Sequence, residues 1–336
     1  MELWSQSLKL LLMTVCISVV ITFLLCKILK RFPRYQDQTP PFGGIAIYIS
    51  FWLAIRLSFA SLNTYQSLVT TFIASTCVLV TGIIDDWYEL KPWQKSIGLL
   101  IVIHIVYFKG DVEFSSVLLP KLSQGYLEIL VYILTIGWIY IVTNAFNLLD
   151  GVDGLASSVA LTSLVTLAFS TFIFSVSIRL VFFTMLLVLA ASILGFLPFN
   201  WAPAKIYLGD TGALFIGFMY ATLTVTNLKN VGLFSMIMPI VLFSVPLFDT
   251  AFAIIRRLFS GRSPLEGDQD HIHHRLLRYG LTAPQTVGIM VLVTLVSSLF
   301  ALGSYLYPLY RPLIMGVGLV SIIVISLYIS RQNIKK

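Results

Sequence analysis

Four short polar stretches interrupt an otherwise apolar sequence, and they carry the residue types that can do chemistry. They read DDWYELKPWQK at 85–95, NAFNLLDGVDGLASS at 144–158, FLPFNWAPAKIYLGDTG at 196–212 and RRLFSGRSPLEGDQDHIHHRLLRYG at 256–280. Acids and amides at a membrane boundary are costly, so a functional role is their default interpretation. A surface crowded with carboxylates repels an anionic substrate unless a cation intervenes, and Mg²⁺ is the usual link between carboxylates and phosphates. An anionic substrate at these stretches would therefore need a divalent cation such as Mg²⁺.

The adjacent acids Asp85 and Asp86 follow a long apolar run. If they are helical, their side chains point about 100° apart. One carboxylate can then serve a metal or act as a general base, while the other faces a neighbouring element. Two anions this close also favour proton acceptance by one of them. The alternative is a helix-capping pair beside an interfacial belt formed by Trp87, Tyr88 and Trp93.

The second stretch carries an amide or an acid at every third residue, namely Asn144, Asn147, Asp150 and Asp153. On a helix such residues are surface neighbours, and the stripe drifts by about 60° per step, so it stays on roughly half the helix. The alternative is a polar loop in which Asp150 or Asp153 caps the next helix.

Asp210 lies between Gly209 and Thr211, just before an apolar run. A helix N-terminus favours bound anions, and a carboxylate there can hold Mg²⁺ against a phosphate. The alternative is capping of that helix by Asp210 or Thr211 itself.

The last stretch holds three of the four histidines in the chain, His271, His273 and His274. A zinc site needs three or four ligands, and no Cys lies nearby, so zinc is weakly indicated. Imidazoles beside Arg275 suit phosphate binding better. Asp249, in the preceding apolar run, is open to both a structural ion pair and a functional role.

The elements that must position these residues are membrane helices. With 58% hydrophobic and 11% charged residues, the chain is too apolar for a soluble domain. The pattern predicts one all-α polytopic membrane domain over 1–336 with about eleven spans of roughly 17–25 residues. The expected spans are 8–30, 44–62, 66–84, 94–108, 127–145, 155–176, 178–198, 212–228, 233–255, 284–306 and 308–329.

The distribution of Lys and Arg predicts the orientation of these spans. Most of the basic residues fall on one side if the N-terminus lies outside and the C-terminus is cytoplasmic. The active site would then be built on the cytoplasmic face from loops 31–44, 85–95, 144–158, 196–212 and 256–280. The net charge of +7 reflects basic residues near membrane edges, which suits topology and anionic lipid rather than nucleic acid.

The ordered set DDWYEL, NAFNLLDGVDGLA, NWAPAKIYLGDTG and DHIHHRLL resembles the polyprenyl-phosphate N-acetylhexosamine-1-phosphate transferases over nearly the whole chain. HIHH followed by RLLRYGL is similar to the N-acetylglucosamine 1-phosphate branch. The resemblance implies transfer of N-acetylglucosamine 1-phosphate from UDP-N-acetylglucosamine to undecaprenyl phosphate with release of UMP. It further implies Mg²⁺ as cofactor with Mn²⁺ as a substitute, a multi-pass plasma-membrane location, a role in starting cell-surface polysaccharides, and compatibility with a homodimer.

The resemblance also implies roles for individual residues. Asp85, Asp86, Asp150 and His273 would be catalytic, with Asp85 deprotonating or positioning the lipid phosphate and Asp86 a metal-side or structural neighbour. Asn147 and Asp210 would bind the metal. The substrate-binding residues would be Asp153, Asn200, Tyr207, His271, His274 and Arg275. The chain departs from many relatives at Asp37-Gln38, where they carry Lys or His, so nucleotide contacts from that loop are not carried over.

Several alternatives stay open at this point. The same reaction could use another UDP-N-acetylhexosamine or UDP-MurNAc-pentapeptide. A secondary transporter also places acids in its spans, but near the midplane and often in paired halves. An intramembrane aspartyl protease would need a Gly where Tyr207 stands, and a CDP-alcohol phosphotransferase would need an Ala-Arg pair soon after Asp150-Gly151. A non-catalytic scaffold would not need four polar motifs on one face.

Overall fold

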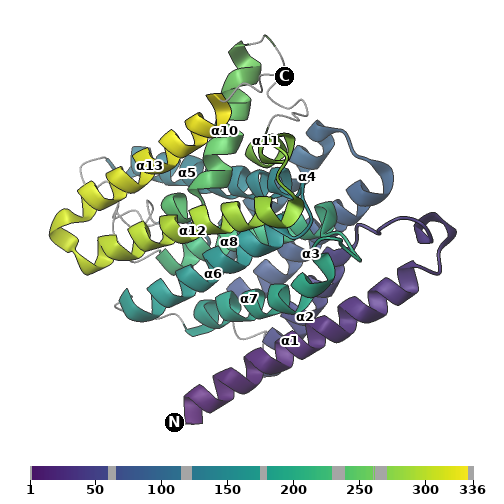
Figure 1. Cartoon of the computed structure of the whole chain (residues 1–336). Coiled ribbons are helices and arrows are strands. Elements are labelled where there is room, and N and C mark those ends of the chain that lie inside the picture. The colour runs from purple at the N-terminus through teal and green to yellow at the C-terminus, as the bar shows by residue number, and fades with distance from the viewer. Residues whose placement is uncertain are drawn as a thin grey trace.

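The all-α prediction is confirmed for the part of the chain that the structure describes. This structure is a computed structural model, and it describes residues 2–59, 66–114, 123–174, 180–228, 239–259, 261 and 271–331. Within these ranges the elements are helices, with no strand among them. They are α1 Glu2–Leu29, η1 Pro33–Tyr35, α2 Gly43–Ser58, α3 Gln66–Tyr88, α4 Pro92–Gly110, α5 Gln124–Leu149, α6 Leu155–Phe174, α7 Leu180–Asn200, α8 Gly209–Leu228, α10 Ser244–Phe259, α11 Ile272–Arg278, α12 Ala283–Leu306, η4 Pro308–Tyr310 and α13 Arg311–Arg331 (Figure 1).

Seven helical segments among the described residues are long and apolar enough to cross a membrane. They are Gln6–Leu29, Gln66–Tyr88, Gly125–Leu149, Leu155–Ile173, Leu180–Asn200, Ala283–Leu306 and Pro308–Ile325. α2 is a shorter apolar helix, while α4 and α8 coincide with predicted spans. The chain is therefore a multi-pass membrane protein, and the count of eleven spans and the orientation of the termini stay predictions. Residues 233–238 of the predicted span 233–255 lie outside the described residues. In the rest of that span the helical structure is interrupted at Phe243, between Pro239 and Pro246.

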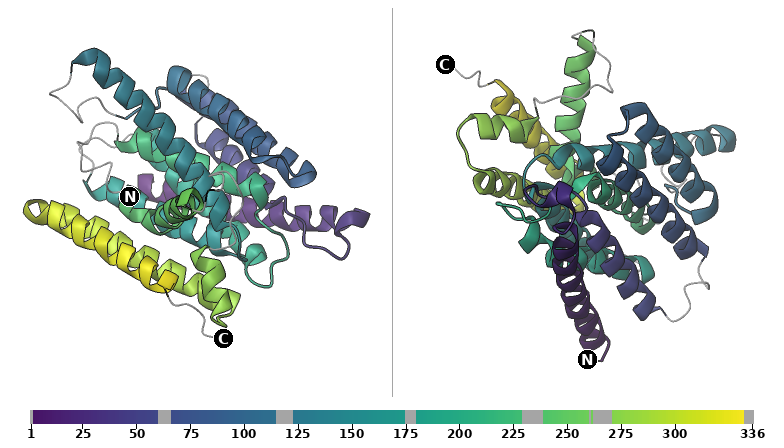
Figure 2. Two further views of the ribbon diagram at one scale, coloured as in Figure 1. Left: turned by 90° about the horizontal axis from the view of Figure 1, so that it is seen from above. Right: turned by 90° about the vertical axis from the view of Figure 1, so that its right-hand side faces the viewer.

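α8 is the central helix. It packs against α5, α3, α2, α7 and α6, and residues 211–226 are all buried. A helix that is apolar on every side must be enclosed by other elements. On one side of it α12 and α13 lie together, and on another α3, α4 and α5 do (Figure 2).

Two glycines let neighbouring helices approach the first turn of α8. A Cβ at Gly44 would lie 2.2 Å from the backbone N of Gly212, and a Cβ at Gly82 would lie 2.5 Å from Cα of Thr211. Such distances leave no room for a larger residue, so both positions require glycine. The start of α2 and the loop before it also pair with the loop before α8. Gly43 N–H donates to the carbonyl of Tyr207 at 3.0 Å, and Tyr207 N–H donates to the carbonyl of Pro40 at 2.9 Å. The start of α8 is therefore held by α2 and α3.

Candidate active site

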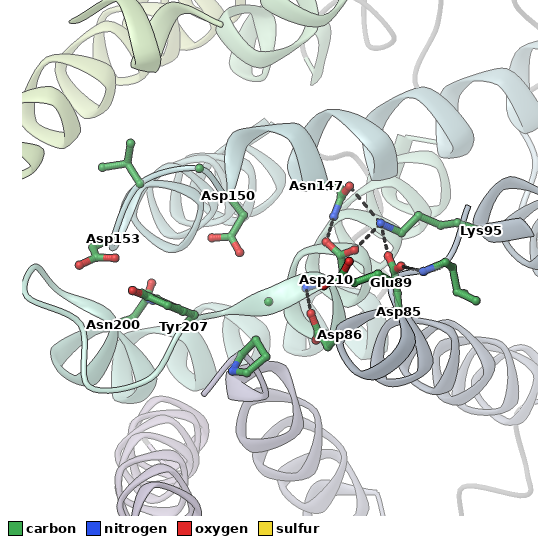
Figure 3. A pocket seen from close by; sticks show the side chains of 15 residues that line it. Asp85, Asp86, Glu89, Lys95, Asn147, Asp150, Asp153, Asn200, Tyr207 and Asp210 are labelled. Carbon is green, nitrogen blue, oxygen red and sulfur yellow. Dashed lines mark hydrogen bonds and ion pairs between the residues drawn. The ribbon is translucent and has the colours of Figure 1, made fainter. Parts of the chain in front are cut away.

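A polar cavity of about 650 Å³ lies beside the first turn of α8 (Figure 3). Its walls come from the end of α3, the start of α4, the end of α5 with the following turn, and the α7–α8 loop. The structure brings eight predicted site residues together there: Asp85, Asp86, Asn147, Asp150, Asp153, Asn200, Tyr207 and Asp210. Lys95, Glu89 and Pro41 also line it.

Lys95 is the centre of the tightest cluster in this cavity. Its Nζ forms ion pairs with Oδ2 of Asp85 and Oδ2 of Asp210, and it donates to Oδ1 of Asn147 at 3.3 Å. The amide of Asn147 donates in turn to Oδ1 of Asp210. The Lys95 side chain is only 15% exposed and that of Asp85 only 6%. One ammonium therefore balances two carboxylates in a largely enclosed place.

Asp85 and Asp86 point in different directions, as expected for adjacent helical residues. Asp85 accepts from the backbone N–H of Leu90 at 2.8 Å and contacts Lys95 inside the cavity. Asp86 accepts from the backbone N–H groups of Asp210 and Thr211, each at 2.9 Å, and from the Thr211 hydroxyl. The carboxylate of Asp86 thus caps α8 from another helix. The pair does not cap the helix that follows it in the chain, because both residues lie in the last turn of α3. Asp86 instead caps α8, which begins much later in the sequence.

The stripe predicted for Asn144 to Asp153 is helical only in its first half. α5 ends at Leu149, and Asp150 occupies its C-cap position. Asp150 therefore leaves the helix and reaches the middle of the cavity (Figure 3). Its pKa is raised well above the usual carboxyl range, first by burial and then by the nearby carboxylates of Asp210 and Asp86. This site concentrates negative charge that a cation would relieve.

The far end of the cavity is formed by Asp153, Asn200 and Tyr207 (Figure 3). Asp153 accepts from the backbone N–H of Ala204 at 3.0 Å, which fixes the loop between α7 and α8. Asn200 accepts from the Ser157 hydroxyl at 2.9 Å and donates to the Ile206 carbonyl at 3.2 Å. Tyr207 is 44% exposed. A fixed rim with an exposed aromatic ring suits a planar polar ligand.

The predicted histidines gather beside the cavity without lining it. His271 and His273 stack with ring centroids 5.7 Å apart, and His273 and His274 approach to 4.2 Å. His273 lies directly behind Gly151, since a Cβ there would come 2.4 Å from its Nε2. Burial and the two neighbouring imidazoles lower the pKa of His273 to about 3, so it is neutral at physiological pH. It can take part in hydrogen bonding there but supplies no positive charge.

Asp249 is tied to the first residues of α11. It accepts from Nδ1 of His271 at 2.9 Å and from the backbone N–H of Ile272 at 3.0 Å. These bonds tie α10 to the start of α11 and so help to place the three histidines. Arg275 also lies on α11 and is not among the cavity-lining residues. Residues 262–270 of the predicted loop 256–280 lie outside the described residues.

Sequence reasoning missed Lys95 as a site residue. Its basic charge near a membrane edge has an ordinary explanation in the orientation of the spans. The signal that could have found it is its place in DDWYELKPWQK, ten positions after Asp85 and just inside the next helix. Only the packing of α4 against α3 and α5 brings its ammonium to Asp210.

The oxygen atoms of this cavity fit a magnesium ion by their chemistry. Carboxylate and amide oxygens are hard ligands, and Mg²⁺ commonly uses one or two protein carboxylates with water and substrate phosphates. The described residues contain no group of three or more His, Cys, Asp or Glu with metal-binding geometry.

Known proteins with similar sequences identify the family. The model of glycosyl transferase family 4 matches residues 68–227. A probable undecaprenyl-phosphate N-acetylglucosaminyl 1-phosphate transferase of Bacillus subtilis (strain 168) is 38% identical over 266 residues, covering 78% of this chain and 72% of the relative. This chain belongs to that family of polyprenyl-phosphate sugar-phosphate transferases. The predicted family resemblance is confirmed.

Other members of the transferase family extend the likeness. A decaprenyl-phosphate N-acetylglucosaminephosphotransferase of Mycolicibacterium smegmatis is 30% identical over 338 residues, covering 88% of this chain and 80% of the relative. An undecaprenyl-phosphate alpha-N-acetylglucosaminyl 1-phosphate transferase of Escherichia coli (strain K12) is 28% identical over 285 residues, covering 80% and 72%. The names of these relatives share one sugar phosphate but differ in the length of the lipid.

Proposed function

We propose that this transferase moves N-acetylglucosamine 1-phosphate from UDP-N-acetylglucosamine to undecaprenyl phosphate. An oxygen of the lipid phosphate attacks the β-phosphorus of the donor, the bridging bond to the α-phosphate breaks, and UMP leaves. The names of the three relatives all carry this sugar phosphate, and two carry the undecaprenyl acceptor. One structural observation carries the proposal: in the cavity, Asp85, Asn147 and Asp210 converge on a single positive charge, the ammonium of Lys95.

Two phosphates repel each other, so their reaction depends on neutralising charge and on positioning. Asp210 and Asn147 would hold Mg²⁺, with Asp85 beside them. When bound, the ion would neutralise phosphate charge and act as a Lewis acid. Asp85, with a buried carboxylate, would position or deprotonate the lipid phosphate. Asp153, Asn200 and Tyr207 would hold the nucleotide at the opposite end of the cavity.

The membrane supports direct attack by the lipid phosphate. A lipid held at the membrane face can be aligned with a bound donor without a covalent enzyme intermediate. The proposal places the cavity on the cytoplasmic side, where UDP-sugars would reach it, and in the plasma membrane. A homodimer remains compatible with this arrangement.

UMP release tests the function. Purified protein is incubated with Mg²⁺, undecaprenyl phosphate and, in parallel, UDP-N-acetylglucosamine, UDP-N-acetylgalactosamine or UDP-MurNAc-pentapeptide. We expect release of UMP with UDP-N-acetylglucosamine, arrest by EDTA and recovery with Mg²⁺ or Mn²⁺. Asp85→Ala and Asp210→Ala should each leave less than about a tenth of wild-type turnover, since truncating a group of a charge-neutralising site costs on the order of 10²-fold or more. No release with any of the donors would refute the proposal, and turnover that persists in EDTA would refute its metal.

A further inference from the structure

Lys95 occupies the position at which the proposed metal ligands converge. Its ammonium contacts Asp85, Asp210 and Asn147 through one oxygen of each. The second carboxylate oxygens are engaged elsewhere, by the backbone of Leu90 and by the Asn147 amide. The carboxylate oxygens that no other protein group binds in these contacts are therefore the ones that hold the Lys95 ammonium.

An ammonium and a divalent cation compete for such oxygens. Both are attracted by the same carboxylates, and they repel each other at contact distance. Because Mg²⁺ also needs close and regular oxygen coordination, the ammonium has to leave the shared oxygens before the ion can use them. The Lys95 side chain can do this, since it is a flexible stem that rises from the first turns of α4.

We propose that Lys95 is an exchangeable counter-cation of the active site. In the metal-free enzyme it holds Asp85, Asp210 and Asn147 together. Entry of a divalent cation displaces the ammonium, which stays within the cavity and pairs with the phosphates of the nucleotide. The pairing of Lys95 with nucleotide phosphates rests on the proposed function. The displacement rests on the observed contacts of Lys95 and on the proposed metal ligands.

The exchange has two physical consequences. It weakens metal binding in the absence of substrate, because the ion must break the contacts of Lys95. It also couples metal and nucleotide, because each metal that binds frees one ammonium for a phosphate. A fixed structural ion pair would produce neither effect: its removal would leave two uncompensated carboxylates and a loosened site.

The test is a Mn²⁺ titration of the purified full chain, followed by electron paramagnetic resonance, without lipid or sugar donor. Lys95→Met keeps the apolar stem, and Lys95→Gln is a second neutral variant in case the first does not fold. Both should bind Mn²⁺ on the order of tenfold more tightly than wild type, as removal of one competing charge near two carboxylates predicts. Lys95→Arg keeps the charge and should stay close to wild type.

Lys91→Met is the matched control. Lys91 lies at the N-cap of the same helix and is exposed. Its removal changes the net charge by the same amount without touching the cluster. We therefore expect Lys91→Met to change Mn²⁺ affinity less than twofold, since an exposed charge is largely screened. Equal tightening in Lys91→Met and Lys95→Met would overturn the exchange.

A second titration with saturating UMP tests the coupling. UMP should tighten Mn²⁺ binding several-fold more in wild type than in Lys95→Met, because only wild type has an ammonium to transfer to the phosphate. Unchanged or weaker Mn²⁺ binding in both neutral Lys95 variants would overturn the proposal, as would equal coupling in wild type and Lys95→Met. If UMP binds neither form while the Mn²⁺ difference persists, the proposed function fails and the displacement stands.

Discussion

Asp86→Asn separates the capping role of this carboxylate from a role in contact with substrate. The Asp86 carboxylate accepts three hydrogen bonds, from the backbone of Asp210 and from the backbone and hydroxyl of Thr211. The amide keeps one acceptor oxygen and turns its NH₂ toward N–H donors. Hydrogen bonds to a charged group contribute about 1.5–3 kcal/mol each, so loss of one or two predicts destabilisation of about 1.5–6 kcal/mol.

The loss would be measured as a lower Tm in detergent, by roughly 2–8 °C if the unfolding entropy scales with the 336 residues of the chain. Because the start of α8 carries Asp210, Mn²⁺ affinity should fall with the Tm. Glu89→Gln is the matched control, because Glu89 also lines the cavity but is exposed. This substitution should change the free energy of unfolding by no more than about 0.5 kcal/mol, and the Tm correspondingly little. A large loss of turnover in Asp86→Asn with an unchanged Tm and unchanged Mn²⁺ affinity would refute the capping role.

Two further predictions follow from the pKa of Asp150 and from the Asp249 contacts. Burial and the neighbouring carboxylates raise the pKa of Asp150, so its ionisation destabilises the fold. Asp150→Asn, assayed in EDTA, should therefore raise the Tm at pH 8 and lose this benefit below the ordinary carboxyl pKa of about 4. A Tm difference that is independent of pH would contradict this. Asp249→Ala removes two acceptor contacts to α11 and should lower both Tm and kcat, whereas Asp249→Asn keeps one acceptor and should restore at least part of each. Equal kcat in the two Asp249 variants would show that these bonds do not position the histidines.

The class of protein could be predicted from the sequence because its cause is local. A helix that crosses a membrane needs an uninterrupted apolar run of sufficient length, and that property is written along the chain. α12, for example, is long and apolar enough to cross a membrane and coincides closely with the predicted span 284–306. The polar stretches could also be found locally, since acids and amides stand out in such surroundings. The cavity accordingly contains Asn147, Asp150 and Asp210, all predicted from their types and places.

The partners of these residues could not be predicted from the sequence. Lys95 and Asp210 are 115 positions apart, and Asn147 and Asp210 are 63 apart. Asp86 caps a helix that begins far along the chain, and His273 lies behind Gly151 instead of inside the cavity. Which carboxylate faces a cation and which faces a backbone N–H depends on how α3, α4, α5 and α8 are rotated and packed. Residue types and spacing determined the available chemistry, whereas long-range helix packing, to which no local pattern is sensitive, decided which groups meet.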